Sequence, residues 1–239
     1  MSEGLKIEAN GPLVTVRIER GEGNEFTREM CEELSGLLME PPAGARVLLL
    51  RSAGTTFCTG RDGSARGASE IRAMARALAE VNVGIVFSEL TVVAEVGGPV
   101  AGFGVGLAGL ADVTIASSAA SFRFPEVAAA LAPALVLAWL PHVVGRRTAY
   151  WLAATGCTFD AAEAMRMGIV NEVAEPESLA KRVDEVVAGL LAAPASVISA
   201  IKRDLLSNSW LQMREDSFAA ADRLALRALT RADQDHARA

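Results

Sequence analysis

The apolar residues of this chain follow two different patterns, one before and one after about residue 135. Continuous apolar runs at 47–50 and 92–96 are typical of strands that are buried on both faces of a sheet. Apolar residues also recur at helical spacing over 27–38 and over the first half of 69–87. From residue 135 onward the pattern is mostly helical. Strands that alternate with helices predict an α/β core, and the last part predicts a helical region beside it.

The composition excludes some partners. The formal net charge of −6 and the lack of a Lys/Arg-rich run argue against nucleic-acid binding, although a few arginines and backbone N–H groups suffice to bind an anionic ligand. The three cysteines, Cys31, Cys58 and Cys157, are widely spaced and form no CxxC or Cys/His cluster, so neither disulfides nor a metal site are expected. The N-terminal residues lack a signal-peptide pattern, and no apolar run reaches the ~18–20 residues of a membrane span. A cytoplasmic protein with no membrane partner is expected.

Three segments carry motifs that point to a family. Residues 57–62 read FCTGRD, residues 97–104 read GGPVAGFG and residues 122–127 read FRFPEV. In this order and spacing they resemble the motifs F-C-A-G-x-D, N-G-x-x-x-G-G-G and F-x-x-P-E-V of the crotonase (enoyl-CoA hydratase/isomerase) superfamily. Asn24 and parts of the stretch 161–170 match weaker positions of the same family, so the resemblance covers nearly the whole chain.

The resemblance implies a fold, a substrate class and an assembly. The implied fold is an α/β fold, with a crotonase-type ββα spiral core over 1–190 and a helical C-terminal region over 191–239 that builds a homotrimer or homohexamer. The implied substrate is an acyl-CoA, with coenzyme A as part of the substrate and with no metal or redox cofactor. Apolar residues suited to a subunit contact in the last part are Phe218, Leu224, Leu226 and Leu229.

The resemblance also implies the residues of an active site. The family holds the enolate of an acyl-CoA thioester with two backbone N–H groups, which it places here on Arg61 and Phe103, and Glu126 is the implied catalytic residue. Loss of one such donor typically costs about 2.7–4 kcal/mol. Phe103 is expected to open a helix running to about Ala111, whose dipole favours a developing oxyanion. The residue at the position of Asp62 is usually structural in the family. The residues expected around the substrate are Asn24, Thr59, Gly60, Asp62, Gly102, Gly104 and Gly106.

One position departs from the hydratase pattern. Hydratases of the family use two glutamates, which correspond to Gly106 and Glu126 of this chain. The family's 3-enoyl-CoA to 2-enoyl-CoA isomerases use one, because a single base can take a proton from C2 and return it to C4. Double-bond isomerisation is therefore predicted. The space beyond Gly106 is expected to be empty, filled by water or taken by the acyl group, and the apolar residues 127–132 are expected to raise the pKa of Glu126.

Other functions stay open from the sequence. Glu95 is a candidate for the missing second acid of a hydratase, and decarboxylation or thioester hydrolysis can use the same oxyanion hole. The last residues do not resemble the segment that closes over CoA in many relatives, so a non-catalytic acyl-CoA-binding protein is a further alternative. Residues 104–109 also match the dinucleotide fingerprint GxGxxG, but residues 97–103 separate them from the preceding strand, which disfavours NAD binding.

Overall fold

Two β-sheets organise the chain. The computed structural model describes residues 2–206 and 208–238, with side-chain contacts up to residue 206 and from 210 to 227. The large sheet has the strand order β1-β2-β3-β4-β6-β9, and the small sheet has the order β5-β7-β8. Apart from the antiparallel hairpin of β1 and β2, the large sheet is parallel. The strands are β1 (Leu5–Asn10), β2 (Leu13–Ile18), β3 (Val47–Ser52), β4 (Thr91–Val96), β5 (Val100–Ala101), β6 (Val113–Ser117), β7 (Ser121–Arg123), β8 (Phe159–Asp160) and β9 (Glu172–Ala174).

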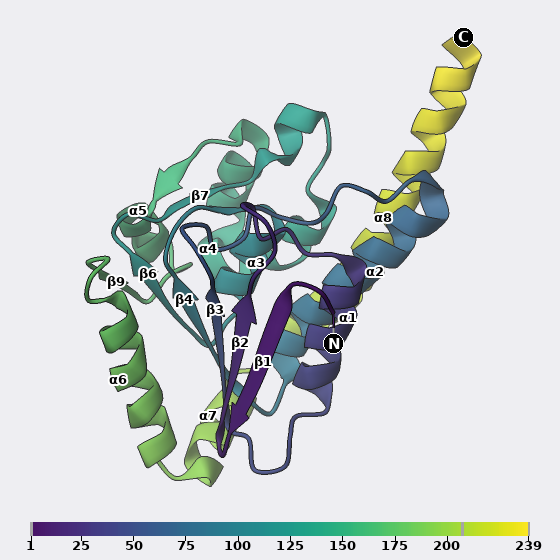
Figure 1. Ribbon diagram of the computed structural model, residues 1–239. Helices are drawn as coiled ribbons and strands as arrows, with labels where there is room; N and C mark the ends of the chain where they lie inside the picture. Colours follow the sequence, from purple (N-terminus) through teal and green to yellow (C-terminus); the bar gives the residue numbers. More distant parts are fainter. Residues whose placement is uncertain (1, 207, 239) are drawn as a thin grey trace.

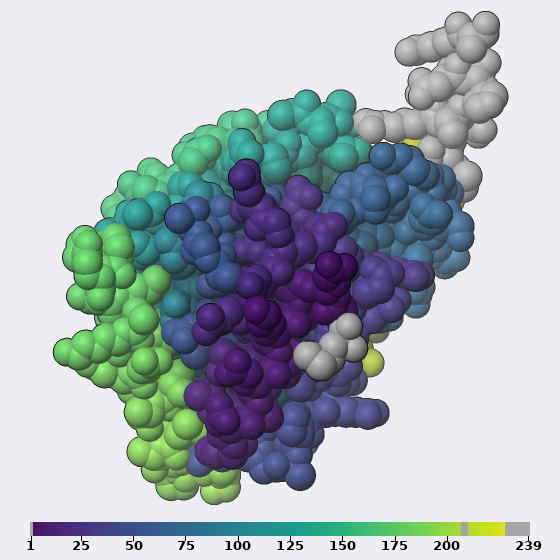
Figure 2. Space-filling view, in the orientation of Figure 1, coloured from purple at the N-terminus to yellow at the C-terminus, as the bar shows by residue number. Residues whose placement is uncertain are grey.

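Helices cover both faces of the large sheet. One face packs against α6 and the other packs against α1, α2, α3 and α4 (Figure 1). On the side seen in Figure 2, the β1–β2 hairpin lies between α6 and α7 on its left and α1 and α2 on its right. The helices are α1 (Arg28–Met39), α2 (Gly67–Phe87), α3 (Phe103–Gly109), the 3-10 helix η1 (Pro125–Ala129), α4 (Ala134–Thr155), α5 (Ala161–Arg166), α6 (Leu179–Ala192), α7 (Ala195–Leu205) and α8 (Asn208–Arg238).

Strand β3 shows why its sequence is a continuous apolar run. Leu48 and Leu50 face the larger core with α1 to α4, whereas Val47 and Leu49 face the smaller core with α6. Both faces are covered, so each position along the strand takes an apolar side chain. Among the described residues no single helix is long and apolar enough to span a membrane; α6 and α7 reach that length only when taken together, and they meet at 103°.

The predicted elements are present with small shifts of their ends. The helix predicted over 27–38 is α1, and the hydroxyl of Thr27 caps it by accepting a hydrogen bond from the N–H of Met30 at 3.2 Å. The helix predicted to begin at Phe103 is α3, which ends at Gly109 and not near Ala111. The last part is helical, and α8 packs along α2 and against α4. The predicted division into two domains stays a prediction.

Candidate active site

The turn at residues 60–62 is held by main-chain hydrogen bonds on one side. The N–H of Phe26 donates to the carbonyl of Gly60 at 3.0 Å, and the N–H of Asp62 donates to the carbonyl of Phe26 at 2.7 Å. The N–H of Arg61, which lies between these two bonds, donates to no acceptor within the described residues. In a parallel pairing of this kind, the middle residue directs its own N–H away from the partner. The turn therefore presents the N–H of Arg61 on the side away from Phe26.

The start of α3 lies directly against this turn. The N–H of Ala101 donates to the carbonyl of Cys58 at 2.9 Å, and a Cβ on Gly104 would lie only 2.1 Å from that same carbonyl oxygen, so this close approach requires glycine. Phe103 is the first residue of α3, where an N–H has no acceptor in its own helix, and it has none elsewhere in the described chain. The segments with the Arg61 and Phe103 N–H groups thus lie side by side. A two-donor oxyanion hole needs this arrangement.

The carboxylate of Glu126 lies next to both segments. A Cβ on Gly102 would lie 3.2 Å from Oε1 of Glu126 and 3.9 Å from Cα of Gly60. The other carboxylate oxygen, Oε2, is buried and has no hydrogen-bond partner within the described residues. This burial raises the pKa of Glu126, while the nearby charge of Arg61 acts in the opposite direction. The direction of the shift agrees with the prediction from the sequence, although residues 127–130 of the apolar stretch are themselves exposed.

Asn24 and Thr59 hold the loop that precedes the turn. The side chain of Asn24 accepts a hydrogen bond from the N–H of Arg20 at 2.8 Å and donates to the carbonyls of Ala53 and Thr56 at 3.3 and 2.8 Å. The φ of Asn24 is +49°, a conformation that asparagine tolerates better than most residues. The hydroxyl of Thr59 donates to the carbonyl of Gly23 at 3.0 Å. Both side chains therefore have protein partners of their own.

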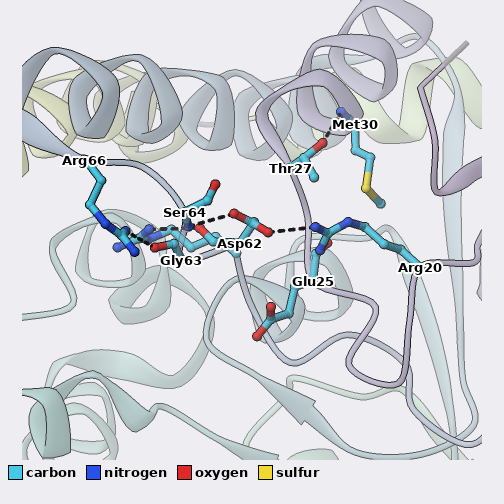
Figure 3. Close-up of polar contacts among 9 residues, drawn as sticks. Arg20, Glu25, Thr27, Met30, Asp62, Gly63, Ser64 and Arg66 are labelled. Carbon is cyan, nitrogen blue, oxygen red and sulfur yellow. Dashed lines mark hydrogen bonds and ion pairs between the residues drawn. The ribbon is translucent and has the colours of Figure 1, made fainter.

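The carboxylate of Asp62 is also fully engaged, as Figure 3 shows. It accepts a hydrogen bond from the N–H of Ser64 at 2.7 Å and pairs with the guanidinium group of Arg20 at 2.7 Å (Figure 3). The hydrogen bonds from Ser64, together with Arg20, lower the pKa of Asp62 to about 2. An acid with so low a pKa holds no proton near neutral pH, so Asp62 fixes the turn and does not shuttle protons.

Two side chains border the space beyond Gly106. A Cβ on Gly106 would lie 3.3 Å from Oδ1 of Asn82 and 3.6 Å from Nε1 of Trp139. Two protein side chains therefore bound the place where the hydratase pattern has a glutamate, and a longer side chain at residue 106 would displace them. The sequence did not single out Asn82. Its only signal is a polar residue between Val81 and Val83 in a helix that is apolar on this side.

Glu95 lies on the wrong side of the sheet to be a second acid. Side chains two residues apart in a strand point to the same face of the sheet. Val93, two residues before Glu95, belongs to the smaller core with α6. The carboxylate of Glu95 is paired with the guanidinium group of Arg51 on β3. The site around Glu126 lies instead at α3, which packs into the larger core. The hypothesis that Glu95 supplies the missing acid is therefore wrong for this structure.

A hollow of about 560 Å³ opens on the other side of Asp62. Neither Glu126 nor Phe103 lines it, so it is separate from the space beside the carboxylate. Charged side chains dominate one end, among them Arg20, Arg28 and Glu29. The hollow is lined by Arg20, Thr27, Arg28, Glu29, Asp62, Ser64, Ala65, Ser69, Glu70, Ala73 and Met74.

Comparison with known proteins identifies the family. The sequence pattern of the enoyl-CoA hydratase/isomerase family matches residues 8–235. The trans-2-decenoyl-[acyl-carrier-protein] isomerase of Streptococcus mutans is 30% identical over 85% of this chain and 81% of its own length. The crotonyl-CoA hydratase of Syntrophomonas wolfei is 29% identical over 79% of this chain and 76% of its own. A protein of Thermobifida fusca YX, whose crystal structure is a complex with CoA, has a TM-score of 0.78 at 27% identity and covers 99% of this chain and 95% of its own.

The chain belongs to the enoyl-CoA hydratase/isomerase family and is an enzyme of that family. The crotonase fold and the family resemblance that the three motifs predicted are confirmed. Relatives with both hydratase and isomerase names match it at similar identity, so the comparison fixes the family and not the reaction.

Proposed function

We propose that this protein is an enoyl-CoA isomerase that moves a double bond from C3–C4 to C2–C3 with Glu126 as its single acid–base group. The observation that carries the proposal is that the Glu126 carboxylate has a buried oxygen without a hydrogen-bond partner. Glu126 is the one acidic side chain among the described residues with a buried oxygen that lacks a partner, and it lies beside Gly60 and Gly102 at the Arg61 and Phe103 N–H groups.

The reaction follows from this geometry. The thioester oxygen accepts hydrogen bonds from the N–H groups of Arg61 and Phe103, and the carboxylate of Glu126 takes a proton from C2. The electron pair of the C2–H bond spreads over C2, C3 and C4 and onto the thioester oxygen as a dienolate, which the two N–H groups stabilise. The protonated Glu126 then delivers the proton to C4, so that the double bond ends between C2 and C3. The raised pKa of Glu126 suits a group that both takes and returns a proton.

Hydration fits the site less well. Syn addition of water needs a second group that orients the water or protonates C2, and Gly106 has no side chain to do this. Glu95 is paired with Arg51 on the other face of the sheet. We infer coenzyme A as the carrier because the Thermobifida fusca relative was solved with CoA.

A pair of variants tests the role of Glu126. Glu126→Gln is expected to lower kcat for 3-enoyl-CoA isomerisation by about 10²–10⁴-fold, the usual contribution of a general acid–base group, with CoA affinity nearly unchanged. The matched control is Glu95→Gln, which removes an acid from the opposite face of the sheet and is expected to keep the turnover of the folded protein. Turnover that survives Glu126→Gln would remove Glu126 from the mechanism.

We also propose that the protein assembles as a trimer or a dimer of trimers through its helical last part. Of the residues predicted for this contact, Phe218 is half-buried beneath the guanidinium group of Arg76, Leu224 is half-buried and Leu226 is exposed. Leu229 lies outside the described side chains. Exposed apolar side chains also occur at Ile201 on α7 and Leu211 on α8. A stable monomer in sedimentation at micromolar concentration would contradict the proposal.

A further inference from the structure

Asn82 is a buried asparagine with no protein partner. It lies in the middle of α2 with 2% of its surface exposed, and Oδ1 is buried without a hydrogen bond. Within the described residues its side-chain amide also donates to no acceptor. Buried polar groups are nearly always paired, and an unpaired one costs roughly 1–3 kcal/mol of stability. We therefore expect the unpaired oxygen of Asn82 to accept a hydrogen bond from a bound molecule that is not part of the folded chain.

The indole of Trp139 provides a second unpaired group at the same place. A Cβ on Gly109 would lie 3.1 Å from Cζ3 of Trp139, whereas a Cβ on Gly106 would lie 3.6 Å from Nε1. The indole therefore lies along the two glycines of α3, with its N–H end at Gly106. Trp139 is buried, and its N–H donates to no acceptor among the residues that the structure describes. Nε1 is not one of the buried unpaired atoms among the described residues, so this N–H keeps some accessible surface.

These two groups lie close to the reacting carbons of the proposed substrate. Gly102 directly precedes α3 and Gly106 is four residues further along, so the two lie about one helical turn apart along the chain. Gly102 adjoins the carboxylate of Glu126, and Gly106 adjoins Asn82 and Trp139. An acyl group with C2 and C4 at Glu126 therefore has its next carbons within reach of the Asn82–Trp139 pair.

We propose that Asn82 and Trp139 bind a hydroxyl group of the acyl chain, which makes the preferred substrate a hydroxylated enoyl thioester. The pair offers one acceptor, Oδ1 of Asn82, and one donor, the N–H of Trp139. A hydroxyl oxygen complements both because it donates one hydrogen bond and accepts another. The inference rests on the proposed isomerase function and adds the substrate class to it.

The test compares substrates that differ only in this group. Hex-3-enoyl-CoA with a hydroxyl on C5 or on C6 is measured against the same compound with a methyl in that place. For at least one of the two positions, wild-type kcat/KM is expected to favour the hydroxyl compound about tenfold, in line with two hydrogen bonds of modest net strength. Asn82→Leu is expected to abolish or reverse this preference. Trp139→Phe removes the N–H alone and is expected to reduce the preference independently.

The remaining outcomes overturn the inference. A wild-type enzyme with no preference at either position, or an Asn82→Leu variant that slows both compounds equally, would give Asn82 a structural role only. Loss of 2-enoyl-CoA hydration in Asn82→Leu would show that the bound oxygen is the reacting water. If the wild type isomerises nothing, the proposed function fails by itself, and equilibrium binding of saturated 5- or 6-hydroxyhexanoyl-CoA against the methyl analogues still decides the inference. Equal affinities would then contradict it.

Discussion

Asn24 and Asn82 are equally buried, each with 2% of its surface exposed, yet they lie in opposite surroundings. Asn24 forms three hydrogen bonds to the main chain and locks the loop before the oxyanion turn. Asn82 has none and lies beside the gap left by Gly106. The loop region satisfies its own polar groups, whereas the region at α3 leaves them unpaired. The first region fixes the loop before the turn, and the second is where we propose that the acyl chain binds.

The two inward-lying acids repeat this contrast. Glu95 is paired with Arg51 on the face of the sheet that packs against α6. Glu126 lies near the start of α3 with one oxygen unpaired, and its burial raises its pKa. A paired acid is held in position, while an unpaired buried acid can change protonation during a reaction. The distribution of partners therefore separates Glu95 from Glu126, the acid that we propose to be catalytic.

The largest expected effect concerns the oxyanion hole. Phe103→Pro removes the N–H at the first position of α3, where a proline ring is tolerated. The loss of one oxyanion donor is expected to lower kcat by about 10²–10³-fold. Phe103→Ala is the matched control, because it loses the same ring contact with Phe26 but keeps the N–H. If a folded Phe103→Pro protein were as active as Phe103→Ala, the oxyanion hole would have to lie elsewhere.

The next effect is on the free energy of unfolding, and it compares substitutions of the two asparagines. Asn24→Leu leaves partly buried main-chain groups of Arg20, Ala53 and Thr56 unpaired and is expected to lower the free energy of unfolding by about 3 kcal/mol. Asn82→Leu removes an unpaired amide and is expected to raise it by about 1 kcal/mol. Urea unfolding of both variants measures the difference. A loss in Asn82→Leu as large as that in Asn24→Leu would mean that Asn82 has a structural partner, such as a fixed water.

The smallest effect is a change of stability with pH. The folded protein holds the proton of Glu126 more tightly than the unfolded chain does, because burial raises the pKa of Glu126 above its ordinary value of 4.5. Its contribution to stability is therefore complete below that value and is lost as the pH rises through the raised pKa. Glutamine does not titrate, so the Glu126→Gln variant does not lose stability in this way. Calorimetry is therefore expected to show that the stability of the variant rises relative to that of the wild type as the pH rises. A difference that stays constant with pH would contradict the raised pKa.

Much of the fold could be predicted from the sequence because the determining signals are local. The apolar run of β3 reports a strand covered on both faces, and Thr27 marks the start of α1. The three motifs also pointed to the segments with Arg61, Phe103 and Glu126, which the structure brings together. In each case the relevant residues lie close in sequence or within one motif.

The environment of Gly106 and the orientation of Glu95 could not be predicted in the same way. Asn82 and Trp139 are on α2 and α4, far apart in sequence, and both lie next to Gly106 of α3. Glu95 alternates with apolar residues in β4, but both faces of that strand are covered, so the alternation does not say which face it occupies. Both results depend on long-range packing.

The central claim is that one unpaired carboxylate, Glu126, performs the chemistry without a second acid. The most direct test is to measure, on the wild-type protein, isomerisation of hex-3-enoyl-CoA against hydration of hex-2-enoyl-CoA under the same conditions. The account predicts that isomerisation is clearly the faster reaction. Hydration as fast as isomerisation would contradict it, because the described structure offers no second acid beside Gly106 to support that reaction.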